Sequence, residues 1–327
     1  VAAGHRSLVL AQAGSTPAGE LVAGPSVAGP LTEAARTRVR GEVRRRLAET
    51  LARHTVDFVH MHGVDFAGYL PPPGPPCLVT LHLPLAWHQA SDLRPGRPDT
   101  WLLPVSESQA RSAPPELRLL PPIPNGVDVD AFARARPRKR RFALFLGRLC
   151  EEKGVHLALD AARAADVPLL IAGEAFAYPE HRAYFDEVVR PRLDARRRYV
   201  GPVTGAAKRR LLAAARCVLI PSLAPETSSL VAREALAAGT PVIAHPVGAL
   251  PEVVDHGRTG FLADGVDALA AALLRADEID PEVCRAEARA RFDVRETTAA
   301  YLALYARLAA GALHAAGQGR GGARVPA

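Results

Sequence analysis

The sequence predicts an α/β protein made of two doubly wound domains, each with a parallel sheet. Its 327 residues, 48% of them apolar, suffice for two domains of ordinary size with separate cores. From Phe142 onward, short aliphatic runs without polar alternation are separated by longer alanine-rich stretches. Such runs are typical of strands that are buried on both faces of a sheet and joined by crossover helices.

The C-terminal half shows this pattern most clearly. It predicts strands at residues 142–146, 168–172, 199–200, 217–221 and 241–244. It predicts helices at residues 153–165, 181–190, 206–215 and 229–238. Pro191 is the natural stop for the second of these helices, because proline cannot continue a helix.

The N-terminal third follows the same scheme. We expect strands at residues 7–11, 57–60, 77–81, 101–105 and 119–122. A long helix is expected at residues 31–53, and a further helix at residues 295–310 near the end of the chain. The proline-rich segment 71–76 can form neither a helix nor an interior strand, so it must lie at a surface.

These elements predict the domain organisation. The expected parts are an N-terminal domain at residues 1–131, a basic linker at 132–141, a C-terminal domain at 142–292, a helix at 293–310 that could pack back on the first domain, and a disordered tail at 311–327. Two doubly wound domains face each other across a cleft, and ligands of such sheets bind beyond the carboxyl ends of the strands. Functional residues are therefore expected at those ends.

Charge and composition limit the partners. Lys and Arg exceed Asp and Glu by 41 to 34, a balance that suits an anionic small molecule, an acidic lipid surface or nucleic acid. The basic clusters at residues 44–46 and 134–141 have no aromatic platform, so we interpret them as a solvated helix face and linker and expect no nucleic acid. The four cysteines are far apart without a CxxC pair, which favours a cytoplasmic location. No apolar run approaches the ~20 residues of a membrane span, although peripheral membrane contact stays open.

The first group of chemistry-bearing residues follows the expected strand at 142–146. Gly147 allows a sharp turn, and Arg148 then projects from the carboxyl end of that strand. Lys153 lies near a helix N-terminus, where the macrodipole disfavours a cation unless an anion such as phosphate is bound. The alternative is that Glu151 and Glu152 neutralise both cations as surface ion pairs.

The second group follows the expected strand at 217–221. Glu226 lies in a loop, and Ser228 or Ser229 is a good N-cap for the helix that follows. Glu234 lies on that helix among apolar residues, where a carboxylate is costly unless it is hydrogen-bonded, and sugar or ribose hydroxyls are suitable partners. The alternative is that Arg233 and Glu234 share one narrow exposed edge.

Together these groups resemble the signature of the family 4 glycosyltransferases (glycosyl transferases group 1), which have the two-domain, Rossmann-like GT-B fold. The family shows a Gly-Arg-x(4)-Lys-Gly element and two glutamates separated by seven residues. Further matching segments occur in the same order at residues 124–128, 239–242, 251–254 and 257–261. The resemblance extends from about Gly4 to Leu308.

The resemblance implies a role for each matching position. Arg148 and Lys153 would bind the donor diphosphate and stabilise the leaving group. Glu226 would hold hydroxyls of the donor sugar, and Glu234 those of the ribose. His82 would face the donor sugar as a catalytic residue. The other expected donor-binding residues are Gly147, Gly201, Val203, Thr227, Ser228 and Ser229.

The reaction implied is transfer of a hexose from a nucleoside-diphosphate sugar, most simply a UDP-sugar, to an unidentified acceptor with retention of anomeric configuration. The acceptor could be a glycan, a lipid or a small metabolite. No cofactor and no catalytic metal are expected. Three alternatives remain: a related sugar-nucleotide epimerase, a phosphorylase, or a non-catalytic nucleotide-sugar-binding protein.

Other motifs point elsewhere only weakly. His60-x-His62 has the form of a metal pair, but no third ligand is in view. Asp128-Val129-Asp130 has the Asp-x-Asp form of metal-dependent glycosyltransferases of the other major fold, yet it lies at the interdomain crossing and is interpreted as a turn. No GxGxxG follows a strand, which argues against a dinucleotide oxidoreductase.

The sequence departs from the family in two places. Family members begin with a strand, a glycine-rich loop and a helix, whereas this chain begins near Gly4-His5, so we expect that opening unit to be missing and the acceptor half to be incomplete. Many relatives have Phe-Gly where this chain has Thr227-Ser228, which indicates a different donor pocket.

Overall fold

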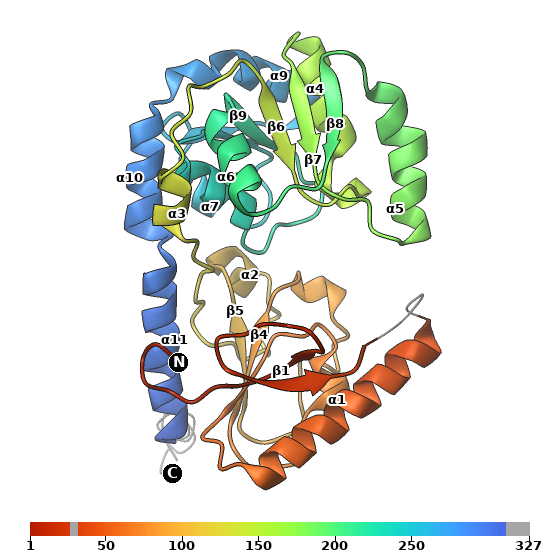
Figure 1. Cartoon of the computed structure of the whole chain (residues 1–327), viewed down its shortest axis with the longest axis vertical. Coiled ribbons are helices and arrows are strands. Elements are labelled where there is room, and N and C mark those ends of the chain that lie inside the picture. The colour runs from red at the N-terminus through yellow and green to blue at the C-terminus, as the bar shows by residue number, and fades with distance from the viewer. Residues whose placement is uncertain (27–31, 312–327) are drawn as a thin grey trace, which may run out of the picture. The chain divides into compact units, whose positions relative to one another are not determined.

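The computed structural model describes residues 1–26 and 32–311 (Figure 1). The expected tail lies outside the described residues, apart from Gly311. Two compact units emerge. The first comprises residues 1–103, 114–120 and 303 onward, and the second comprises residues 104–113 and 121–302.

The second unit contains a six-stranded sheet in which every recorded strand pair is parallel. Its strand order is β11-β10-β9-β6-β7-β8. The bounds are Ala143–Leu146 for β6, Leu169–Ala172 for β7, Arg197–Gly201 for β8, Cys217–Ile220 for β9, Val242–Ala244 for β10 and Gly260–Leu262 for β11. The five strands expected here are confirmed, whereas β11 is not foreseen by the sequence pattern.

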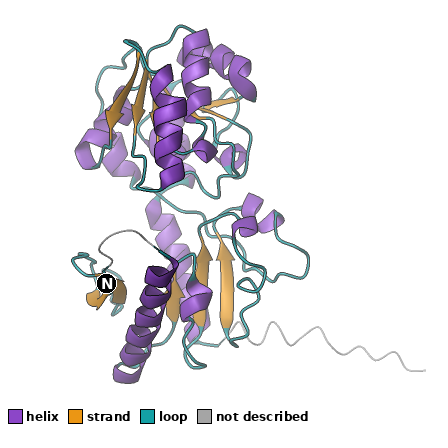
Figure 2. Ribbon diagram, turned by 90° about the vertical axis from the view of Figure 1, so that its right-hand side faces the viewer, coloured by secondary structure: helices purple, strands orange, loops and turns teal. Residues whose placement is uncertain are grey.

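The helices of this unit form two groups, and Figure 2 shows them packed around the strands. One group pairs α4 with α9, and the other joins α7 to α3, α6 and α10. The bounds are Val129–Ala133 for α3, Val155–Ala164 for α4, Pro179–Ala183 for α5, Gly205–Ala214 for α6, Leu230–Ala237 for α7, Leu250–Val253 for α8, Gly265–Arg275 for α9 and Pro281–Arg291 for α10. Alanines on α4 and α7 are buried, so the helices approach the sheet closely.

One expected helix is wrong in its details. The helix predicted at residues 181–190 is α-helical only over Pro179–Ala183 and continues as a π-helical turn over Tyr184–Val189. A 3₁₀ turn, Arg190–Arg192, then closes it around Pro191. Proline lacks the N–H that would continue the α-helical ladder.

The first unit contains two separate sheets. β3 (Val59–Met61), β4 (Cys77–Leu81) and β5 (Thr100–Pro104) form one sheet, and β3 pairs with β4 in parallel. β1 (Leu8–Gln12) pairs with β2 (Glu20–Gly24) instead of joining that sheet. This unit also contains the helix α1 (Glu33–Arg53), capped by Thr32, and two 3₁₀ turns, Phe66–Tyr69 and Leu85–Trp87. The short α2 (Glu107–Arg111) belongs to the second unit.

The strand expected at residues 119–122 is wrong. Only an isolated bridge joins Leu119 to Leu102. Leu120 still donates its N–H to the Leu102 carbonyl, but Pro121 and Pro122 have no N–H to continue the ladder.

The last helix, α11 (Val294–Ala309), is shared between the units at residue 302. Its second half packs on β3 of the first unit through Tyr305, which stacks on Phe58 at a centroid separation of 4.3 Å and meets Nδ1 of His60 at 2.7 Å. At its start, the Val294 N–H donates to the Val127 carbonyl. The second unit therefore extends N-terminal to the basic linker at residues 132–141.

Candidate functional site

The strand order of the second unit reverses between β6 and β9. From β6 the chain proceeds to β7 and β8 on one side, and then returns to β9 on the other side. In open parallel sheets, this point at the carboxyl ends of the strands is where ligands bind. The loop that starts at Gly147 follows β6, and the loop that contains Glu226 follows β9. The two groups singled out in the sequence therefore flank the reversal.

The two loops are held against each other by their backbones. Gly154 has a φ of +65°, and a Cβ at this position would lie 2.0 Å from the Pro221 carbonyl oxygen, so only glycine fits. The Leu223 N–H donates to the Glu152 carbonyl at 2.8 Å. The loop after β6 thus has a fixed position relative to the loop after β9.

Glycines also line the carboxyl ends of β6, β7 and β8. Gly173, which the sequence analysis did not single out, has a φ of +147°, and a Cβ there would lie 1.8 Å from the Gly147 carbonyl oxygen. Its N–H donates to the Gly201 carbonyl at 3.0 Å. Gly147 and Gly201 are thus joined through Gly173, and Val203 packs half-buried beyond them against the core.

Lys153 and Glu226 meet across the two loops. Lys153 Nζ lies 2.6 Å from Glu226 Oε1, and the glutamate side chain is only 11% exposed. The Ser222 hydroxyl donates to the same oxygen at 2.6 Å. Ser222 is a partner that the sequence analysis missed. The carboxylate is consequently held in one place by two donors on one oxygen.

Arg148 has a different environment. It follows Gly147 directly and is half-buried. Within residues 1–26 and 32–311, no carboxylate lies within 4.0 Å of its guanidinium nitrogens. The alternative in which Glu151 and Glu152 neutralise both cations is wrong for Lys153, which pairs with Glu226 instead. Arg148 forms no ion pair with either glutamate, although a hydrogen bond from the Cys150 thiol and, less strongly, the charge of Arg148 help to lower the pKa of Glu152. A guanidinium that projects from a strand end without a carboxylate partner is suited to bind an anion.

Glu234 is paired as well. It lies on α7 with a side chain that is 12% exposed, and its Oε1 is 2.6 Å from Nζ of Lys208 on α6. Lys208 also lies over the Phe132 ring, 5.5 Å from its centroid. The ion pair with Lys208 offsets the free-energy cost of burying the Glu234 carboxylate on an apolar helix. Lys208 escaped the sequence analysis because it is 26 residues away and no local spacing connects it to Glu234.

The neighbouring Arg233 is buried, at 3% exposure. Its Nε donates to the Ser228 carbonyl at 3.1 Å, its Nη1 donates to the Asn125 carbonyl, and its guanidinium lies over the Phe292 ring. Burial lowers the pKa of Arg233 to about 10. The alternative in which Arg233 and Glu234 share an exposed edge is wrong. Arg233 instead fixes the loop that leads into α7.

That loop leaves the start of α7 without a side-chain cap. Ser229 occupies the N-cap position with a φ of +51°, and its side chain makes no capping hydrogen bond. Ser228 follows Thr227 in the loop, and its hydroxyl oxygen is buried without a partner among the described residues. The first amides of a helix that lacks a side-chain cap attract anions through their N–H groups and the helix dipole.

His82 belongs to the first unit and follows β4. Its Nε2 lies 3.0 Å from Nδ1 of His62, which provides the neighbour that the sequence did not reveal. His60 uses both ring nitrogens for hydroxyl groups, those of Tyr305 and Thr80, each at 2.7 Å. Burial lowers the pKa of His82 and His62, and it lowers that of His60 to about 3. All three imidazoles are therefore neutral at neutral pH.

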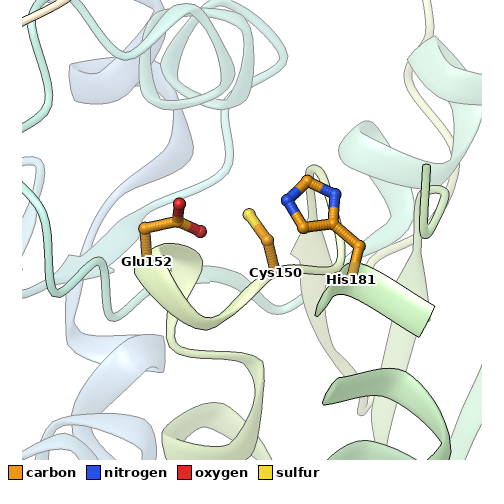
Figure 3. A group of neighbouring side chains, drawn as sticks. All are labelled: Cys150, Glu152 and His181. Atoms are coloured by element: carbon orange, nitrogen blue, oxygen red, sulfur yellow. The ribbon is translucent and has the colours of Figure 1, made fainter. Parts of the chain in front are cut away.

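A further group of side chains that could hold a metal ion lies in the second unit (Figure 3). It consists of Cys150, Glu152 and His181, and it combines a thiol, a carboxylate and an imidazole. The sequence analysis missed it, because His181 on α5 is distant in sequence and none of the spacings resembles a metal motif.

In the ranges that the structure covers, no helix combines the length and the apolar character needed to cross a membrane.

Comparison with known proteins finds a family match within the second unit. Residues 140–277 match the model of the family described as Glycosyl transferases group 1. Over 164 residues the chain is 39% identical to the phosphatidyl-myo-inositol mannosyltransferase of Mycobacterium tuberculosis, a match that covers 46% of this chain and 42% of that protein. The chain spans about half the length of the curated relatives it matches.

Solved structures extend the likeness to nearly the whole chain. A glycosyltransferase involved in avilamycin A biosynthesis is 25% identical, with a TM-score of 0.66 over 95% of this chain and 86% of that chain. An Anabaena protein solved in complex with UDP-glucose is 20% identical, with a TM-score of 0.65 over 90% of this chain and 86% of that chain.

Proposed function

From the premise that residues 140–277 are a glycosyl transferases group 1 domain within a chain of GT-B fold, we propose that this protein is a retaining hexosyltransferase. It moves a hexose from a nucleoside-diphosphate sugar to an acceptor. The observation that carries the proposal is the arrangement at the strand reversal. There, Lys153 from the loop after β6 pairs with Glu226 from the loop after β9. Arg148 precedes Lys153 in the first loop, and α7 begins shortly after Glu226 in the second.

The diphosphate is the donor group that this arrangement fits best. Arg148 offers a planar fork of N–H donors, and Lys153 offers a compact charge on the adjoining turn. The amides that follow Ser229 add helix N–H groups without a competing side-chain cap. As the bond to the sugar breaks, negative charge develops on the diphosphate, and donors fixed in advance stabilise it without reorganisation.

The two carboxylates would hold the hydroxyls of the donor. Glu226, fixed by Lys153 and Ser222, is placed to accept hydrogen bonds from the sugar. Glu234 lies on α7 and would accept hydrogen bonds from the ribose while it stays paired with Lys208. The segment from Gly201 to Val203 would contact the base.

The donor proposed here is UDP-linked. The structural likeness to an Anabaena protein solved with UDP-glucose supports this choice. The first unit, with His82, would supply the acceptor side, and transfer on the same face of the sugar would retain the anomeric configuration. No cofactor and no catalytic metal are invoked, and the cytoplasmic location stays a prediction from the cysteine pattern.

Product analysis tests this function. The protein is incubated with UDP-glucose, UDP-galactose or GDP-mannose and with candidate lipid, glycan and inositol acceptors. A transferase releases nucleoside diphosphate in step with a glycosylated product of retained configuration. Consumption of free phosphate would indicate a phosphorylase, release of the nucleotide with a rearranged free sugar an epimerase, and binding without any turnover a non-catalytic protein. Each of these three results contradicts the proposal.

Glu234→Ala is expected to weaken binding of the donor nucleotide about tenfold, because a hydrogen bond to a charged group contributes about 1.5–3 kcal/mol and Lys208 compensates part of the loss. Isothermal titration calorimetry with the nucleoside diphosphate measures the affinity. Lys208→Met serves as the matched control, since it removes the ion pair but leaves the carboxylate. An unchanged affinity in Glu234→Ala would exclude the ribose assignment.

A further inference from the structure

The cluster of Cys150, Glu152 and His181 brings together two separate parts of the second unit. Cys150 and Glu152 lie in the loop after β6, between Arg148 and Lys153, whereas His181 lies on α5. Figure 3 shows the sulfur between the carboxylate and the imidazole ring, with all three side chains directed toward one another. One ligand atom from each residue lies within 4.8 Å of the other two.

This spacing is compatible with a shared metal ion. Zinc binds Cys sulfur at about 2.3 Å and His nitrogen or Glu oxygen at about 2.0–2.2 Å in a tetrahedral arrangement. Ligand atoms of such a site are about 3.3–3.6 Å apart, so a small inward movement of side chains would complete the geometry. A combination of sulfur, nitrogen and oxygen ligands suits zinc better than calcium or magnesium, which prefer oxygen.

The imidazole of His181 is directed into the cluster. The residue is 8% exposed, so the ring is buried. In Figure 3 the ring nitrogen nearest the Cys150 sulfur is Nε2, and Nδ1 lies on the far side of the ring. Nε2 is therefore the nitrogen that would bind a metal ion between the three side chains.

The same cluster does not suit a nucleophilic thiol. Cys150 is fully buried, so an incoming substrate could not reach its sulfur.

We propose that Cys150, Glu152 and His181 bind one Zn²⁺ ion, with a water molecule as the fourth ligand. Binding releases the thiol proton to solvent and involves no oxidation or reduction. The thiolate and the carboxylate together cancel the two charges of the ion, so the filled site is neutral. Its role is structural: it ties α5 to the loop that carries Arg148 and Lys153.

Cobalt titration of the whole purified, metal-stripped chain tests this inference without reference to any transferase activity. Co²⁺ replaces Zn²⁺ in tetrahedral sites, and its bond to a thiolate gives a charge-transfer band in the near ultraviolet. One equivalent of Co²⁺ is expected to produce this band, and Zn²⁺ is expected to abolish it by displacement. At a free metal concentration 100 times Kd, the unfolding temperature of the second unit is expected to rise by about 5–10 °C.

Three variants locate the site. Cys150→Ser is expected to lose the charge-transfer band, whereas Cys284→Ser, the same change at another buried thiol, is expected to keep it. His181→Gln is expected to lower the affinity for Co²⁺ at least about tenfold, and it replaces Cys150→Ser as the decisive variant if that protein does not fold. The proposal would be overturned by the absence of a band in the unaltered chain. An unchanged band in a folded Cys150→Ser protein, or an unchanged affinity for Co²⁺ in His181→Gln, would overturn it as well.

Discussion

Replacing Glu226 with Gln is expected to lower turnover about 100- to 1,000-fold, the range seen when one pre-positioned polar group is removed from an active site. Glu226 is held by Lys153 and Ser222 on one oxygen. The amide keeps the shape of the side chain but removes the negative charge that pairs with Lys153. It also replaces one of the two oxygens that would accept hydrogen bonds from the sugar hydroxyls. Turnover is measured as release of nucleoside diphosphate from the donor at saturating concentration.

The same variant is expected to bind the free nucleotide with an affinity within about threefold of the unaltered protein, because Glu226 is assigned to the sugar and not to the nucleotide. Glu151→Gln, an exposed glutamate in the loop after β6, is the matched control and should turn over normally. Normal turnover in Glu226→Gln would contradict the assignment of this carboxylate to the donor sugar.

Arg148→Ala is expected to weaken UDP binding about tenfold to 150-fold, because charge-assisted hydrogen bonds contribute about 1.5–3 kcal/mol. No carboxylate among the described residues lies within 4.0 Å of the Arg148 guanidinium nitrogens, so their N–H groups remain available to the diphosphate. Binding of uridine, which lacks phosphate, is expected to be unchanged. Calorimetric titration with UDP and with uridine separates the two contributions.

Arg138→Ala removes an exposed arginine from the basic linker and should leave both affinities unchanged. This control separates a specific diphosphate contact from a general effect of positive charge. A general effect would lower the affinity for UDP in both variants, and added salt would reduce it in both. Equal weakening of UDP and uridine in Arg148→Ala would show that the substitution disturbs the fold of the loop, and the diphosphate assignment would fail.

Much of the second unit could be predicted from its sequence, because its strands are buried on both faces and therefore appear as unbroken aliphatic runs. Cys217–Ile220 is buried at every position, and the expected strand there ends one residue later, at Pro221. The loops at the carboxyl ends were also predictable. Each combines a turn residue with charged side chains directly after an apolar run, as at Gly147 and Glu226.

The elements that escaped prediction lack such contrast. β11 has only three residues, Gly260–Leu262. Because this strand is so short, the sequence does not show where the alanine-rich α9 begins. In the first unit, β2 (Glu20–Gly24) is short and only partly buried, so its sequence carries little periodicity. Burial by tertiary contacts, which sequence patterns do not contain, defines these segments.

The partners of the predicted side chains could not be found from sequence for a related reason. Ser222 lies only four residues before Glu226, but no sequence signal shows how the loop after β9 turns to bring them together. Lys208 reaches Glu234 from the neighbouring helix α6. His181 meets Cys150 because the segment after β7 runs beside the loop after β6. The contacts of Lys208 and His181 follow from the strand order, which the sequence pattern left open.

The measurement that tests the central claim most directly is calorimetric titration of the whole chain with UDP, GDP and ADP, each at equal ionic strength. The arrangement of Arg148, Lys153 and Glu234 predicts binding of one nucleoside diphosphate per chain. The proposed UDP-linked donor predicts that UDP is preferred over GDP and ADP. The absence of binding by all three nucleotides, in a chain shown to be folded, would contradict the proposal that the strand reversal of the second unit is a nucleotide-sugar site.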